Sequence, residues 1–421
     1  MEFKNFLNKN SFKELCYFLV MACAIGIFSV ILAKSCEGAF FAFLYIFHHL
    51  HYWVLLIIPT GFVTISYLIK NYFPEAEGSG IPQTMAMSNS PNSNNLRRFF
   101  IPRVIFTKFI FIVLGTGFGA TIGREGPTVQ IGAIIMLLGK KGLTTIAKKT
   151  LITIGAAAGL AAAFNTPIGG MVFAFEELSK SASQEMILKK VSGIAVAGIT
   201  VMLIIGNYSY FGRVERHLLN YDWKIFVIAL VIGIFAAVNC YLLNKIIYYL
   251  TLSPTSKINK WRKSHLYLTA AICGLICAII GVLSSGLSFG NGYIESNDLL
   301  NNNMILPKFY YLYKMSAAIF SSASGVPGGY FATSLAIGNG IGNFIHNIYA
   351  VANIQQYCLL GMAAFLAALT RAPVTAIVMI LQITSSQVFT LPIIVAALTA
   401  TWVAHVFGKG IYEYQIENYL K

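Results

Sequence analysis

Four long stretches without a charged residue constrain the fold of this chain more than any other feature. They cover residues 16–33, 52–69, 225–243 and 266–287. A helix needs about 20 apolar residues to cross the hydrocarbon core of a bilayer, and each stretch approaches or exceeds that length. Only 11% of the 421 residues are charged, against about 25% in a typical soluble domain. The pattern predicts an all-α protein that crosses the membrane several times.

The chain is strongly basic, with a net charge of +15. Its basic residues lie mostly in short segments between apolar stretches, where lysine and arginine mark cytoplasmic loops. Lys4, Lys9 and Lys13 predict a cytoplasmic N-terminus, and the segment 257–263 predicts a second cytoplasmic loop. No nucleic-acid-binding signature accompanies these charges, so we expect the lipid bilayer as a partner and no nucleic acid.

The first apolar stretch lacks a small-residue cleavage site, so we expect a retained helix rather than a signal peptide. The first two spanning helices are expected at residues 14–35 and 51–70.

The segment 119–133, GATIGREGPTVQIGA, carries two charges inside an apolar region, Arg124 and Glu125. A carboxylate at membrane depth is a functional residue by default. The surrounding glycines interrupt a continuous helix, and Pro127 suits the first turn of a new one. Free N–H groups at a helix start carry partial positive charge and bind anions. Glu125 would then mimic an anion in its own binding site. The alternative is an ion pair with Arg124, but adjacent side chains do not face each other on a helix.

An internal repeat divides the chain. A shift of 206 residues places GAAAGLAAAFNTPI at 155–168 on GMAAFLAALTRAPV at 361–374. The same shift places residues 123–132 on 329–338, where the first, last and penultimate residues agree. One offset that serves two separate segments is hard to obtain by chance. The two halves are therefore interpreted as copies of one unit.

The repeat also predicts how the halves are oriented. A shift of 212 residues places Gly-Ser-Gly at 78–80 on Gly-Asn-Gly at 290–292, which is a weaker match. The repeats are expected at about 14–205 and 222–421, within one transmembrane domain that spans the whole chain. If the first repeat begins inside and the segment 257–263 is also inside, the second repeat begins outside. That is an inverted-topology repeat, in which ion sites form from broken helices where the halves meet.

Four motifs carry a resemblance to a known family. They are GSGIP at 78–82, GREGP at 123–127, GGYFA at 328–332 and GKGIY at 408–412. In order and spacing they resemble the anion-pathway signatures of the CLC family of chloride channels and proton-coupled chloride antiporters, over essentially the whole chain. The resemblance implies broken, tilted helices that meet at a central anion pathway. It also implies a homodimer of the bacterial type in the inner membrane, without the cytoplasmic CBS domains of larger relatives.

Several of these residues have a chemical interpretation of their own. Ser79, between two glycines, can present its hydroxyl and nearby backbone N–H groups to an anion, or it can cap a helix. Tyr330 and Phe331 follow two glycines and can offer backbone amides at a helix start, although an aromatic residue in a membrane helix is more often a packing residue. Tyr412 lies in a short terminal segment, where interfacial tyrosines are common.

The resemblance implies specific roles. It makes Ser79, Tyr330, Phe331 and Tyr412 the chloride ligands. It makes Glu125 the external gate, which blocks anion sites when charged and swings out when protonated, and Glu177 the internal proton relay. Glu177 could otherwise be a solvated helix end. The other residues of the selectivity motifs are Gly78, Gly80, Ile81, Pro82, Gly123, Arg124, Gly126, Pro127, Gly329 and Ala332.

The expected function is secondary active exchange of chloride for protons. A passive voltage- or pH-gated chloride channel of the same fold is the alternative. Fluoride and nitrate remain possible substrates, with Ser79 arguing against both. Departures from the family pattern at Gln83, Tyr330, Thr333 and Gly410 are expected to alter rate and selectivity rather than abolish chloride binding.

H-E-x-x-H and paired intramembrane aspartates are missing from the sequence. We therefore expect a protein that is not an enzyme. Histidines 48, 49 and 51 are spaced as metal ligands but lack acidic partners, and they are interpreted as loop or interface residues. The seven cysteines lie mostly inside apolar runs and are interpreted as packing residues. We expect no cofactor and no metal, with chloride bound only as substrate.

Overall fold

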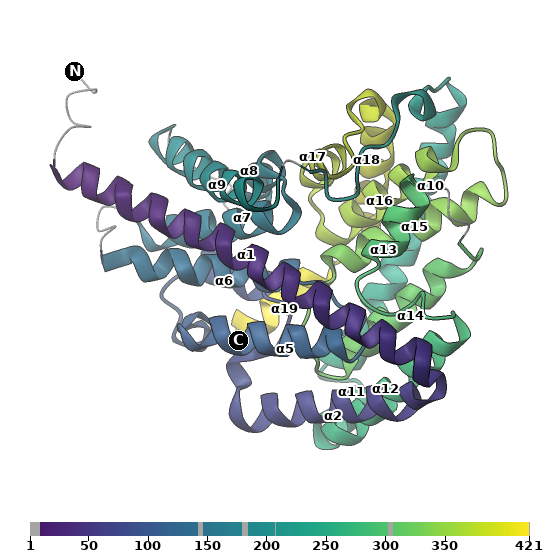
Figure 1. The fold of residues 1–421 in the computed structure, drawn as a ribbon, viewed down its shortest axis with the longest axis horizontal. Helices are drawn as coiled ribbons and strands as arrows, with labels where there is room; N and C mark the ends of the chain where they lie inside the picture. The colour runs from purple at the N-terminus through teal and green to yellow at the C-terminus, as the bar shows by residue number, and fades with distance from the viewer. Residues whose placement is uncertain (1–8, 142–145, 179–183, 207, 302–305, 421) are drawn as a thin grey trace.

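The computed structural model describes residues 9–141, 146–178, 184–206, 208–301 and 306–420, and this part of the chain is almost entirely helical (Figure 1). The predicted all-α architecture is confirmed. The first half holds α1 (Lys9–Leu50), α2 (Val54–Tyr72), α3 (Ile81–Asn89), α4 (Asn94–Arg97), α5 (Arg103–Gly117), α6 (Glu125–Leu138), α7 (Lys148–Phe164), α8 (Pro167–Phe173) and α9 (Gln184–Ile205). The second half holds α10 (Lys224–Ile247), α11 (Lys257–Ser264), α12 (Leu266–Leu283), α13 (Tyr293–Asn301), α14 (Tyr310–Ala323), α15 (Phe331–His346), α16 (Ile354–Thr370), α17 (Pro373–Thr384), α18 (Thr390–Val406) and α19 (Ile411–Leu420).

The helices differ widely in length. Within the described residues, four helical stretches are long and apolar enough to cross a membrane, or five if α4 and α5, bent by 63°, count as one span. Other apolar helices, among them α6, α16 and α17, have only 10–17 residues. A helix this short begins or ends inside the bilayer. The chain is thus an integral, multi-pass membrane protein with broken helices.

The first helix is longer than predicted. Residues 14–35 were expected to form the first span, but α1 continues without interruption to Leu50. Lys34 and Glu37 do not end the helix, because their side chains pair across one turn at 2.7 Å on its exposed surface. In Figure 1 α1 crosses the whole molecule, and α2 returns beside α12 of the second half.

The helices follow the offsets of the sequence repeat. α7 and α16 begin at Lys148 and Ile354 and so lie 206 residues apart. Each ends at a residue with left-handed backbone, Asn165 (φ 54°) and Arg371 (φ 63°). α3 and α13 have nine residues each, and their starts lie 212 residues apart, as in the weaker sequence match. The repeat boundaries at 205 and 222 stay predictions.

The halves meet at a pair of equivalent glycines. Gly123 and Gly329 form an isolated antiparallel bridge, in which each N–H donates to the carbonyl oxygen of the other at 2.8 Å. Two equivalent residues that exchange identical hydrogen bonds are related by a local twofold axis that passes between them. This axis runs between the N-termini of α6 and α15, which begin two residues after these glycines.

Glycines also allow the backbones of paired helices to touch. A Cβ added to Gly132 in α6 would lie 2.2 Å from the carbonyl oxygen of Gly155 in α7. The same contact recurs in the second half, where a Cβ at Gly338 would lie 2.3 Å from the carbonyl oxygen of Gly361. Small residues let membrane helices approach this closely, and they fix the pairs α6 with α7 and α15 with α16.

We expect Gly361→Val to destabilise the protein by about 2 kcal/mol or more, because overpacking a buried contact costs roughly 1–3 kcal/mol. A Cβ at this position would lie 2.0 Å from the carbonyl oxygen of Gly338. Gly38→Val is the matched control, because an added Cβ there meets nothing within 4 Å. Thermal unfolding of both variants in detergent measures the difference, and equal melting temperatures would contradict the assignment of these contacts.

Candidate anion pathway

Three of the four motifs meet through contacts between their backbones. A Cβ at Gly80 would lie 2.4 Å from the carbonyl oxygen of Gly126, and a Cβ at Gly126 would lie 2.6 Å from that of Ser79. A Cβ at Gly329 would lie 3.2 Å from the backbone nitrogen of Gly126. Gly80 also has φ 109°, a conformation that favours glycine. These contacts bring the N-termini of α3, α6 and α15 together.

The loop before α3 places Ser79 at this junction. Gly78 has φ 77°, so two residues with left-handed backbone enclose the serine. Ile81 and Pro82 then form the first turn of α3. Ser79 is buried, and its hydroxyl has no hydrogen-bond partner among the described residues. Buried polar atoms are normally paired, so this hydroxyl is free to bind a ligand.

Glu125 lies at the start of α6 with its carboxylate turned back toward the junction. The residue is 0% exposed, and neither carboxylate oxygen forms a well-aligned hydrogen bond to a described residue. A Cβ at Gly123 would meet Glu125 Oε2 at 2.3 Å and the backbone nitrogen of Ala332 at 3.4 Å. The carboxylate thus lies between the N-termini of α6 and α15, with the N–H groups of Glu125 and Ala332 nearby.

The start of α6 agrees with the sequence expectation. α6 begins at Glu125, so Pro127 lies in its first turn. The backbone N–H of Thr128 donates to the carbonyl oxygen of Arg124 at 3.1 Å and closes this turn. The Arg124 guanidinium donates to the carbonyl oxygen of Ala33 at 2.7 Å. In the described part of the chain, it forms no ion pair with Glu125.

Tyr330 and Phe331 have side chains that are already engaged. The Tyr330 hydroxyl hydrogen-bonds to Ser322 Oγ, and the Phe331 ring packs 5.7 Å from that of Phe164. What this helix start offers to a ligand is therefore its backbone N–H groups. Thr333 stands where the family pattern has proline, and its hydroxyl donates to the Tyr330 carbonyl oxygen at 2.9 Å. That bond supports the same first turn.

Tyr412 approaches the junction from the C-terminal helix. α19 packs along α3, and Gln83 Nε2 donates to Tyr419 of α19 at 3.0 Å. Tyr412 is buried, and its hydroxyl has no partner among the described residues. It lies within electrostatic range of Tyr330, Glu125 and Glu177. Gly410, the departure from the family motif, has ordinary contacts of 3.5 Å or more around an added Cβ.

A cavity of about 430 Å³ reaches Ser79 and Tyr330 from the side of α11. Lys70, Arg262 and Lys263 also line it. α11 is the basic segment that the sequence places in the cytoplasm. Basic walls raise the local concentration of anions, so this cavity, here called the inner cavity, suits an anion on its way to Ser79.

A second cavity, of about 630 Å³, contains Glu177. Tyr412 and Arg371 also line it. The adjacent Glu176 has a structural role. Its carboxylate accepts hydrogen bonds from the backbone N–H groups of Thr375 at 2.6 Å and Val374 at 3.0 Å. It thereby caps α17, as anionic groups do at helix N-termini. In the sequence, only the family resemblance distinguishes Glu177 from Glu176.

A third cavity, of about 280 Å³, lies near Arg124 and is here called the outer cavity. Asn291, the repeat counterpart of Ser79, lines it together with Tyr210. Ser79 therefore opens to the inner cavity and its counterpart opens to a different one. This arrangement is what an inverted repeat requires.

Lys108 is a candidate that sequence reasoning missed. It is 0% exposed, and its Nζ donates to Gln130 Oε1 at 2.5 Å and to the carbonyl oxygen of Glu77 at 3.2 Å. The sequence held a signal: Lys108 is the only charge in residues 104–123, and a shift of 206 residues places it on Lys314, again the only charge in its stretch.

Comparisons with known proteins agree with this geometry. The sequence pattern of the family described as voltage gated chloride channel matches residues 60–405. The fold resembles that of a slow cyanobacterial chloride/proton antiporter, with a TM-score of 0.81 and 22% identity over 97% of this chain and 98% of the other. It also resembles a CLC-type fluoride/proton antiporter (TM-score 0.80, 22% identity, 97% and 99% coverage). A eukaryotic CLC transporter gives a TM-score of 0.77 at 20% identity, over 96% of this chain and 74% of that one.

The fold and the junction of helix starts thus define a membrane protein of the inverted-repeat class with a central anion site. The family match covers most of the chain, and the protein belongs to the voltage-gated chloride channel family.

We expect Ser79→Ala and Tyr330→Phe to separate hydroxyl from amide ligands. Loss of the unpartnered Ser79 hydroxyl should weaken chloride binding about ten-fold, because a hydrogen bond to a charged group contributes roughly 1.5–3 kcal/mol. Tyr330→Phe should leave affinity nearly unchanged, because that hydroxyl already bonds to Ser322. Calorimetric titration of the purified protein with chloride tests both, and an equal loss in the two variants would make the Tyr330 hydroxyl a ligand.

Proposed function

We propose that this protein is a secondary active antiporter that exchanges chloride for protons. The observation that carries the proposal is the position of Glu125, whose buried carboxylate lies between two helix N-termini without a well-aligned hydrogen bond. A chloride ion is attracted to the same N–H groups. The ionised carboxylate and chloride therefore compete for one place, and a protonated Glu125 leaves that place to chloride.

The chloride ligands in this proposal are Ser79, Tyr412 and the helix start at Tyr330 and Phe331. Support comes from the two buried hydroxyls, which lack partners among the described residues. The basic inner cavity supplies a route for the anion to Ser79. Chloride is then a substrate held by hydrogen bonds alone, and the mechanism requires no cofactor.

Glu177 relays protons in this proposal, while Glu125 receives them from outside. Glu177 and Ser79 line different cavities, so protons and chloride reach the junction along separate paths. Tyr412 borders the Glu177 cavity and lies within electrostatic range of Glu125. The two paths therefore join close to Tyr412. Movement of Glu125 between its charged and protonated forms couples them, because only one form admits chloride.

The proposal includes chloride as the preferred anion, a homodimer with one pathway in each subunit, and a bacterial inner membrane. Ser79 is the residue that favours chloride over nitrate and fluoride, by its resemblance to the family motif. One matched structure is a fluoride/proton antiporter, so transport should be measured with both halides.

The test is proton movement into liposomes that contain the purified protein, under a chloride gradient with the membrane voltage clamped. The wild type should move protons against their gradient. Glu125→Gln and Glu177→Gln should both abolish proton movement, because neither amide can carry a proton between the paths. Glu413→Gln is the matched control, since this carboxylate lines the same cavity as Glu177, and it should retain coupled transport.

Chloride flux without proton movement in the wild type would contradict the exchange mechanism and make the protein a passive channel. Proton movement that persists in Glu177→Gln would remove that residue from the proton path and leave the role of Glu125 to be judged from its own variant.

A further inference from the structure

Two fully buried lysines occupy equivalent positions in the two repeats. Lys108 in α5 and Lys314 in α14 are each 0% exposed. Each Nζ donates to the backbone of a loop that precedes a helix start: Lys108 to the carbonyl oxygen of Glu77 at 3.2 Å, and Lys314 to that of Phe289 at 2.7 Å. The two acceptors are also repeat counterparts, 212 residues apart. The repeat has therefore kept a buried lysine against the same loop in both halves.

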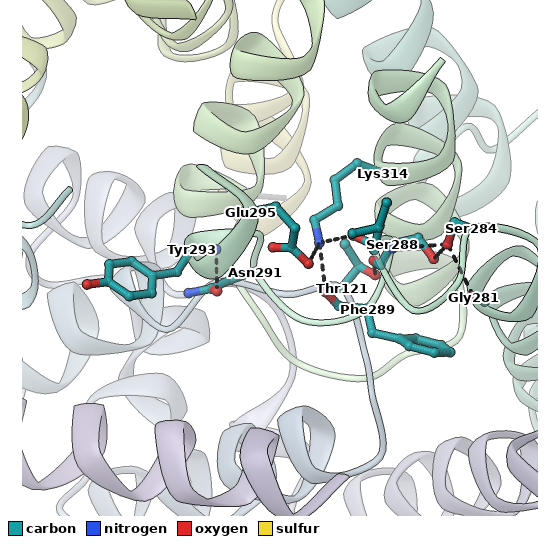
Figure 2. A network of polar contacts seen from close by, with 10 residues as sticks. Thr121, Gly281, Ser284, Ser288, Phe289, Asn291, Tyr293, Glu295 and Lys314 are labelled. Atoms are coloured by element: carbon teal, nitrogen blue, oxygen red, sulfur yellow. Dashed lines mark hydrogen bonds and ion pairs between the residues drawn. The ribbon is translucent and has the colours of Figure 1, made fainter. Parts of the chain in front are cut away.

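The second-half lysine has an acidic partner. Figure 2 shows the Lys314 ammonium between the Glu295 carboxylate and the carbonyl groups of the loop. Glu295 Oε1 lies 4.0 Å from Lys314 Nζ, and both side chains are buried. The backbone carbonyl oxygen of Ser288, in the same loop, accepts a hydrogen bond from Thr121 Oγ1 at 2.8 Å. The positive charge of Lys314 is thus compensated where it lies.

The first-half lysine has no such partner. Within the described residues, no carboxylate lies within ion-pair distance of Lys108, and its side-chain acceptor is the neutral amide of Gln130, at 2.5 Å. The residue equivalent to Glu295 is Gln83, 212 positions earlier. The carboxylate of Glu77 is half exposed and faces Arg98 at 3.5 Å. Lys108 is therefore buried without a carboxylate in direct contact, and Glu77 acts on its ammonium only at longer range.

This charge lies against the loop that holds Ser79. Gln83 Oε1 accepts from the Gly80 N–H at 2.9 Å, and Gln83 Nε2 donates to the Glu77 carbonyl oxygen at 2.9 Å. Lys108 donates to that same oxygen. Since both nitrogens bond to one atom, the ammonium and the Gln83 amide lie within about 6 Å of each other. A carboxylate at position 83 would lie within about the same distance of the ammonium.

We propose that Lys108 sets the affinity of the anion site at Ser79, and that Gln83 keeps its charge uncompensated. This inference rests on the assignment of an anion to Ser79 in the proposed function. A buried charge without a counter-ion is unfavourable, and an anion at Ser79 supplies the counter-ion that the protein lacks. The second repeat, with its own carboxylate, does not need one. Position 83 therefore determines how strongly the inner half of the pathway attracts anions.

The test is calorimetric titration of the purified protein with sodium chloride at neutral pH. Gln83→Glu adds a negative charge beside Lys108, and Lys108→Met removes the positive one; each should weaken chloride binding about ten-fold or more, because unit charges interact strongly in a buried site. Gln83→Met is the matched control. It removes the hydrogen bonds of Gln83 without adding a charge, and affinity should stay within about three-fold of wild type.

Glu295→Gln makes the same change in the second repeat. It should leave the affinity of the Ser79 site within about two-fold of wild type, because Lys314 contacts a different loop. Each variant must elute as a single dispersed species. If Lys108→Met does not fold, the comparison of chloride affinity between Gln83→Glu and Gln83→Met tests the inference by itself.

Unchanged affinity in Gln83→Glu, or an equal loss in Gln83→Met, would overturn the inference and leave exchange of chloride for protons untouched. Absence of chloride binding in the wild type would instead contradict the proposed function. The titration requires no proton movement, so the two failures are distinguishable.

Discussion

Helix starts buried inside a membrane protein need partners for their first N–H groups, and this constraint shapes the centre of the molecule. The N-termini of α3, α6 and α15 meet in its buried interior. The chain places a carboxylate of its own, Glu125, among them. In the proposed function, a mobile anion takes the place of this carboxylate.

The two repeats have similar backbone arrangements, but side chains at equivalent positions have diverged. The paired glycines and the helix offsets are kept in both halves. Gln83 and Gln130 of the first half stand opposite Glu295 and Ala336 of the second, and Glu177 stands opposite Ile383. Divergence of this kind gives a pathway that is symmetrical in shape but not in charge. A device that moves protons and anions through one junction needs the two ends to differ chemically.

The sequence predicted the class of fold and the repeat, because these depend on apolar runs and on repeated glycine motifs. The candidate residues at the junction came from those motifs together with their resemblance to a known family. The sequence did not predict that α1 runs on to Leu50, since Lys34 and Glu37 look like a helix end until their pairing is seen. It did not single out Lys108. A lysine at a membrane surface and a lysine buried against a loop have the same local sequence, and only the packing of α5 against α6 separates them.

The glycine junction has a mechanical consequence. Side chains in a packed interface can change rotamer and let two helices slide, but at Gly80, Gly126 and Gly329 backbone rests on backbone, and no rotamers are available. A shift of α6 relative to α15 would also break both bonds of the Gly123–Gly329 pair. The centre of the pathway therefore behaves as one stiff body. A movement that opens or closes this centre has to be small. The movement that remains available is the rotation of single side chains about their own bonds.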